Sequence, residues 1–195
     1  QQRARGQDEE RRELNVDILP TIPQTALDGK SPLDVQGDVK YRVRLLAAIL
    51  LLELHGQQSR WNFDYDELRR KLELPTGEAI DPESVDLRHV SLIRYPRLDA
   101  AKLSTDQLLQ LFQHSAMMSA AVAVQHLGQE LVERDLSSEE ISIISVYEIL
   151  ARSALDSEDA LTWISKARDA ETAEGGSPAR WLLAELSLQI EQGNG

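Results

Sequence analysis

The chain has 195 residues, a mass of 21.9 kDa and a formal net charge of −12 at pH 7. Hydrophobic residues make up 42%, enough for a core, but aromatic residues supply only 5%, and 10 glycines and 7 prolines are too few for the turns of a β-sandwich or barrel. The acidity disfavours a nucleic-acid partner, because phosphate contacts need a basic face. With no cysteine, the chain has no disulfide, thiolate metal site or cysteine nucleophile.

The sequence contains no membrane or targeting segment. Its longest apolar run, residues 45–52, has 8 residues, whereas about 20 are needed to span a bilayer. The chain opens with Gln1 and has no apolar stretch typical of a secretory signal. We therefore expect a cytoplasmic piece of a longer protein, with no membrane partner.

The first part of the chain is polar and then rich in proline. Residues 1–13 are dominated by Gln, Arg and Glu and are predicted to form a linker or disordered tail. Residues 14–37 contain three prolines and are predicted to form an ordered, extended arm with a turn at Asp28-Gly29. The large aliphatic side chains expected to dock this arm on the helices are Leu14, Val16, Ile18, Leu19, Ile22 and Leu27.

A central apolar helix is predicted to follow the arm. It begins after Asp38, a candidate N-cap, and ends at Gly56. Its second half is apolar nearly all round, which indicates a helix covered on several faces. A shorter helix is expected at about 65–72, whereas residues 76–103 show no regular pattern. The arm and these helices, residues 14–103, are predicted to form one helical subdomain.

The C-terminal part is predicted to be a run of five helices. Three of them carry start signals, either a capping box or a serine before proline: Ser104 with Gln107, Ser137 with Glu140, and Ser177 with Pro178. No Gly- or Ser-rich linker interrupts residues 38–192. We therefore expect this subdomain, residues 104–195, to share one core with the preceding subdomain.

Two helix pairs of this region repeat in sequence. A shift of 35 places residues 108–112 over residues 143–147, and both segments run apolar-apolar-polar-apolar-aromatic. A shift of 40 aligns the helices that follow, with these pairs of positions: Ala120 on Ala160, Val124 on Ile164, and Leu127 on Ala167. Such self-similarity is typical of stacked helical hairpins.

The second copy resembles a known repeat family. Residues 159–168 resemble the second helix of a tetratricopeptide repeat (TPR), whose small residues at the first and eighth positions let two helices approach closely, and residues 146–151 resemble its first helix. The resemblance covers about residues 104–192 and implies a protein-interaction scaffold. It is degenerate: Leu150-Ala151 replaces the family's glycine, and Pro178 opens a helix instead of closing one.

The predicted fold class is therefore all-α. TPR-like hairpins form the C-terminal half, and an extended N-terminal arm packs on the central apolar helix. An irregular helical bundle with ordinary packing of small residues is the alternative.

No motif in the sequence points to catalysis or to a metal. None of the four histidines lies three or four residues from another, as a helical metal site would require. There is no nucleophile elbow, zinc-protease pair or glycine-rich dinucleotide turn. The acidic residues within 81–89 are better explained as a solvated loop than as a metal or acid–base site. We expect a protein that is not an enzyme and has no cofactor.

The expected function is protein–protein interaction through the C-terminal helices. Stacked hairpins leave a concave surface on which a peptide or helix can lie. Residues 135–195 carry a net charge of −8, which favours a neutral or basic partner, although the charge is also explained by a solvated face alone. The two C-terminal tryptophans either stack across their hairpin or line a groove. The candidate partner-binding residues are Trp163, Trp181, Tyr147, Arg152 and Glu148.

Two further hypotheses remain open. The chain is a regulatory or accessory segment of an enzyme whose catalytic domain lies outside it, or it forms a homo-oligomer through an apolar edge of its last helix.

Overall fold

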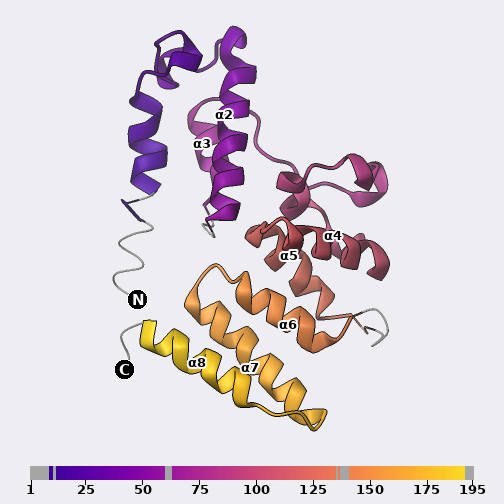
Figure 1. Cartoon of the computed structure of the whole chain (residues 1–195). Helices are drawn as coiled ribbons and strands as arrows, with labels where there is room; N and C mark the ends of the chain where they lie inside the picture. Colours follow the sequence, from indigo (N-terminus) through magenta and orange to yellow (C-terminus); the bar gives the residue numbers. More distant parts are fainter. Residues whose placement is uncertain (1–8, 11, 60–62, 135, 137–140, 192–195) are drawn as a thin grey trace. The chain divides into compact units, whose positions relative to one another are not determined.

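The computed structural model is all-α, as predicted (Figure 1). Across the residues that it describes there is no β-strand, and β-type pairing is limited to two isolated bridges, Gln24 with Lys30 and Ile80 with Leu98. The structure describes residues 9–10, 12–59, 63–134, 136 and 141–191.

The chain divides into two compact units. The N-terminal unit comprises residues 1–56 and 63–78, and the C-terminal unit comprises residues 57–62 and 79–195. The division at residue 78 differs from the predicted boundary at residue 103, because residues 79–103 pack with the helices that follow them. Ile80, Leu98 and Leu103 are buried in one cluster with Leu108 and Phe112. That the two parts share one core stays a prediction.

The segment expected to be an extended arm is a series of short helical turns. A proline fits the start of such a turn, where its missing N–H has no partner to lose, and Pro20 takes this place. The predicted turn is confirmed, with Asp28 and Gly29 at φ of +58° and +79°. The turns are a π-helical one, η1 (Leu14–Ile18), and three 3₁₀ ones, η2 (Leu19–Thr21), η3 (Thr25–Leu27) and η4 (Leu33–Val35).

The arm is docked by fewer side chains than expected. Val16 and Leu27 are buried, whereas Leu14, Ile18 and Ile22 are exposed. Most of the predicted polar tail lies outside the described residues. Its described residues, 9, 10, 12 and 13, are helical, and Arg12 forms an ion pair with Glu67.

Two helices complete the N-terminal unit, α2 (Val39–Gln58) and α3 (Tyr65–Lys71). Asp38 caps α2 as predicted, because its Oδ1 accepts the N–H of Lys40 at 2.9 Å. The helix runs past Gly56 instead of ending there. It is covered on one side rather than on several, since it buries Ile49 but leaves Leu51 67% exposed.

A buried ion pair joins α2 to α3. The guanidinium of Arg69, 4% exposed, lies 2.5 Å from a carboxylate oxygen of Glu53 and 2.8 Å from one of Asp66. Beside it, the hydroxyl of Tyr65 donates to the carbonyl of Leu52 at 2.8 Å. Burial, together with the nearby charge of Glu53, raises the pKa of Tyr65 to about 12.

The C-terminal unit begins with four 3₁₀ turns and continues with five helices. Each helix packs on the next, α4 on α5, α5 on α6, α6 on α7 and α7 on α8, so neighbours in sequence are neighbours in space (Figure 1). The turns are η5 (Pro82–Ser84), η6 (Leu87–His89), η7 (Leu92–Arg97) and η8 (Ala100–Lys102). The helices are α4 (Thr105–Met117), α5 (Ala121–Leu131), α6 (Ile143–Arg152), α7 (Ser157–Ala173) and α8 (Ala179–Glu191).

Local signals explain where these helices begin and end. The capping box of Ser104 and Gln107 is present at α4, and Asp156 caps α7 through the N–H of Asp159. Gly175 ends α7 at a φ of +82°, a value that favours glycine. The capping box predicted at 137–140 lies outside the described residues, but the helix expected to open there begins only at Ile143, where the hydroxyl of Ser142 accepts the N–H of Ile144 at 3.2 Å.

The aligned positions of the sequence repeat match in burial for the second helices and only in part for the first helices. All six residues of the shift by 40 are buried: Ala120, Val124, Leu127, Ala160, Ile164 and Ala167. In the shift by 35, Leu111 and Val146 are both buried and Gln110 and Ser145 are both exposed, whereas in the other three aligned pairs one residue is buried and its counterpart is half-buried. The second helices of the two pairs therefore bury equivalent positions, and the first helices do so only at Leu111 and Val146.

A glycine allows close packing inside this array. A Cβ at Gly128 of α5 would lie 2.5 Å from Leu150 of α6 and 2.9 Å from Phe112 of α4. We expect Gly128→Val to lower the free energy of unfolding by about 1–3 kcal/mol, the usual cost of overpacking a core. Urea unfolding followed by tryptophan fluorescence measures this. Gln129→Val, at the exposed neighbouring position, is the control, and equal stability of both variants would contradict the packing.

Candidate functional site

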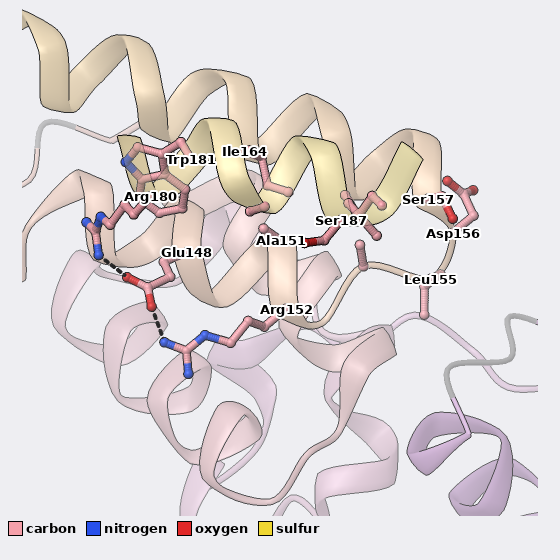
Figure 2. A pocket seen from close by; sticks show the side chains of 14 residues that line it. Glu148, Ala151, Arg152, Leu155, Asp156, Ser157, Ile164, Arg180, Trp181 and Ser187 are labelled. Carbon is pink, nitrogen blue, oxygen red and sulfur yellow. Dashed lines mark hydrogen bonds and ion pairs between the residues drawn. The ribbon is translucent and has the colours of Figure 1, made fainter. Parts of the chain in front are cut away.

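A groove of about 720 Å³ lies between α6, α7 and α8 (Figure 2). Its size falls within the range of about 300–1,000 Å³ that ligand pockets span. Its floor is apolar, formed by Ala151, Ala154, Leu155, Ala160, Ile164, Trp181, Ala184 and Leu188.

The hollow follows from the alternation of small and large side chains. Four of the eight floor residues are alanine, and an alanine side chain stops at Cβ, so it leaves space that a larger residue would fill. Ile164 and Trp181 are the large side chains that border this space, and both are buried. The groove is therefore a gap in otherwise packed helices, with apolar walls.

One end of the groove is bordered by an ion-pair network. Glu148 of α6 accepts from Arg152, one turn further along the same helix, and from Arg180 of α8 at 3.2 Å (Figure 2). Glu148 is 28% exposed, whereas Arg152 and Arg180 are 71% and 52% exposed. Exposed pairs of this kind contribute little stability, but this one joins α6 to α8 across the groove.

Trp181 is held in place by the same network. Its indole N–H donates to Glu171 of α7, which also accepts from the Nε of Arg180 at 2.9 Å. The guanidinium of Arg180 lies over the indole ring, 4.3 Å from its centroid. The hydrogen bond from Trp181, followed by that from Arg180, lowers the pKa of Glu171. Trp181 is therefore a fixed wall of the groove.

The other end of the groove is acidic. Asp156 and Ser157 lie there, away from the arginines (Figure 2). Asp156 accepts the N–H of Asp159 at 2.8 Å. Burial, and the charges of Asp156 and Glu158, raise the pKa of Asp159. Carboxylates thus gather at the start of α7, where the helix dipole favours them.

The structure brings together three of the five predicted binding residues. Glu148, Arg152 and Trp181 line the groove. Tyr147 and Trp163 do not line it: their rings stack on each other, with centroids 6.0 Å apart and planes at 22°.

Trp163 is part of the core rather than of the groove. Its indole N–H donates to the side-chain oxygen of Gln125 at 3.2 Å, and the amide of Gln125 donates to the carbonyl of Leu150 at 2.8 Å. Trp181 is buried in a separate cluster with Ile164. The two tryptophans therefore fill different clusters: the alternative that they stack across the hairpin is wrong, and of the two only Trp181 lines the groove.

The sequence analysis missed the alanines and Leu188 of the floor. On α8 the signal was helical spacing, because Ala184 and Leu188, both half-buried, follow the buried Trp181 on one face of the helix. Glu171, which orients Trp181, was also missed, because it lies one helix away.

The remaining polar clusters have ordinary structural partners. His114 is exposed, with Nδ1 3.1 Å from the hydroxyl of Tyr95, and His126 is half-buried, with Nε2 2.8 Å from the carbonyl of Leu98. Within the described ranges, no group of three or more histidines and carboxylates is placed to hold a metal ion. No helix in that part of the chain combines the length and hydropathy needed to cross a membrane.

Comparisons with protein-family models, with curated proteins and with solved structures found no match to this chain.

Proposed function

We propose that the chain is a non-enzymatic protein–protein interaction module whose C-terminal groove binds an apolar segment of a neutral or basic protein. The observation that carries this proposal is the groove itself: a hollow with an apolar floor between α6, α7 and α8, bordered by charges at both ends. Grooves of this kind take the apolar face of an amphipathic helix or peptide.

We also propose that α4–α8 are TPR-like hairpins. The support is the packing of consecutive helices and the burial of the aligned residues of the second helices, among them Ala160 and Ala167. These two alanines occupy the positions at which the TPR family places small residues. In such an array, the groove lies where one hairpin meets the first helix of the next.

The charges around the groove define the partner that fits best. Both groove arginines are paired with glutamates, so neither is available as a clamp for an acidic group. At the opposite end, Asp156 and the carboxylates beside it favour a cation. The acidic end of the groove and the net charge of −8 on residues 135–195 repel acidic segments. They lower the association rate of such segments and disfavour their alignment in the groove.

Filling the groove should abolish binding. We expect Ser187→Trp to do so, because Ser187 is an exposed residue that lines the groove. Thr172→Trp is the matched control. The hydroxyls of Ser187 and Thr172 each donate to the carbonyl four residues earlier in their helix, at 2.9 Å and 2.7 Å respectively. Thr172, however, does not line the groove. Both substitutions should leave the fold intact.

The measurement is a titration with amphipathic peptides that share one apolar face and differ only in net charge. We expect neutral and basic peptides to bind the unmodified chain and the Thr172→Trp variant, acidic peptides to bind more weakly, and the Ser187→Trp variant to lose binding. Equal binding by both tryptophan variants, or binding that ignores peptide charge, would contradict the proposal.

A further inference from the structure

The two ends of the groove differ in whether their charges are neutralised. At the end where α8 begins, Arg152 and Arg180 both pair with Glu148, and Arg180 also pairs with Glu171. Two cations thus face two carboxylates, and this end of the groove carries no net charge. A charged side chain of either sign gains little by lying there.

The opposite end carries an excess of negative charge. Asp156 lines the groove there (Figure 2), and Glu158 and Asp159 follow it in the first turn of α7. In the part of the chain that the structure describes, none of these three carboxylates forms an ion pair. Asp156 uses one carboxylate oxygen to cap α7, by accepting the N–H of Asp159 at 2.8 Å. This end therefore offers carboxylates to a cation that none of the groove's own residues supplies.

The distance between the two ends sets the length of the segment that fits. Along α8 the floor runs from Trp181 to Leu188, and these residues are seven positions apart. At a rise of about 1.5 Å per residue, this is about 10 Å, or two turns of helix. Trp181 lies at the arginine end, and Ser187 lies towards Asp156 (Figure 2). A bound helix therefore covers the floor with two turns of apolar side chains, and its next turn reaches Asp156.

We infer that the segment bound here is an apolar stretch of two helical turns with a lysine or arginine at one end, and that it lies with this end beside Asp156. The inference rests on the proposed function, because it concerns the same groove. A cation beside Asp156 meets carboxylates that have no other cation, whereas at the arginine end it meets charges that are already balanced. The groove thus selects the position of a charge in its partner as well as the net charge, and the charge fixes the register of the apolar side chains.

Two peptides of identical composition test this selection. Both are helical and carry apolar residues along two turns of one face. The first has its single lysine one turn beyond that face, and the second has it at the middle of the polar face. We expect the first peptide to bind about fivefold more tightly, the factor that a partly exposed ion pair supplies. Isothermal titration calorimetry measures both affinities. Equal affinities would overturn this inference but leave the proposed groove intact, whereas a lack of binding by either peptide would contradict the groove itself and the inference with it.

Two variants of the chain show whether Asp156 is the origin of the preference. Asp156→Asn removes the charge but keeps the cap, since asparagine and aspartate cap helices equally well, and it should remove most of the difference in affinity. Glu174→Gln is the matched control, because it removes one negative charge at the other end of α7, from an exposed residue that does not line the groove. It should leave the difference unchanged. A difference that survives Asp156→Asn, or that both variants reduce alike, would overturn the inference.

Disulfide trapping tests the direction in which the segment lies. The chain has no cysteine, so Ser157→Cys, at the Asp156 end of the groove (Figure 2), provides its sole thiol. Oxidation should link this thiol to a peptide with a cysteine beside the lysine. It should not link a peptide with the cysteine at the other end of the apolar stretch, about 10 Å away and beyond the roughly 7 Å between Cα atoms that a disulfide spans. Any other pattern of linking would overturn the proposed orientation.

Discussion

Replacing Arg69 by methionine should lower the free energy of unfolding of the N-terminal unit by about 3–5 kcal/mol, the usual cost of removing one partner from a buried ion pair. The Arg69 side chain is 4% exposed and that of Glu53 is 10% exposed. Without the guanidinium, the buried Glu53 carboxylate loses the cation that lies 2.5 Å from it, and Asp66 loses its ion pair with Arg69 as well. The large effect comes from the charge that is left behind.

Two comparison variants isolate this cause. Removing both charges, in Glu53→Leu with Arg69→Met, should restore much of the lost stability, because the most deeply buried carboxylate is removed together with the cation. Arg70→Met, at a position 59% exposed on the same helix, should cost less than about 1 kcal/mol. Hydrogen exchange resolved by peptide should be followed in α2 and α3, since a chain of two units need not unfold in one step. A double variant less stable than Arg69→Met would contradict the explanation.

Replacing Phe112 by alanine should destabilise the C-terminal unit by about 3–5 kcal/mol. Phe112 is fully buried in one cluster with Leu108 and Leu127, and it lies against α5 at Gly128. The substitution leaves a cavity that the neighbouring helices cannot close.

Met117→Ala on the same helix is the control, because Met117 is 82% exposed and its truncation removes little packing. Urea unfolding followed by tryptophan fluorescence measures the loss, because two of the three tryptophans of the chain, Trp163 and Trp181, lie in this unit. If Phe112→Ala lowers the free energy of unfolding by less than about 1 kcal/mol, or if both variants lower it equally, α4 is not packed as described.

The C-terminal helices were predictable because their signals are local. The capping box at Ser104 and the helical spacing of apolar residues depend only on nearby positions. The arm was not predictable in the same way, since a proline such as Pro20 suits an extended segment and the first position of a helical turn equally well. The boundary of the units was missed because the bridge between Ile80 and Leu98 forms only in the folded chain.

The groove residues that could be predicted from the sequence are those with a charged side chain or an indole N–H. Glu148, Arg152 and Trp181 were found by their chemistry, and all three line the groove. The contact of Glu148 with Arg180 joins positions 32 residues apart, and the hollow itself is made by alanines, which carry no chemistry. Tyr147 and Trp163 were misplaced because an aromatic residue on an amphipathic helix serves a core and a groove equally well.

The proposed function is tested most directly by chemical-shift mapping of the isotope-labelled chain during titration with a basic amphipathic peptide. The groove predicts that shifts cluster on α6, α7 and α8, with Ala151, Ile164 and Ala184 among the residues most affected, and that the Ser187→Trp variant shows none of them. Shifts confined to the N-terminal unit, or no shifts with any peptide of the charge series, would contradict a binding groove in the C-terminal unit.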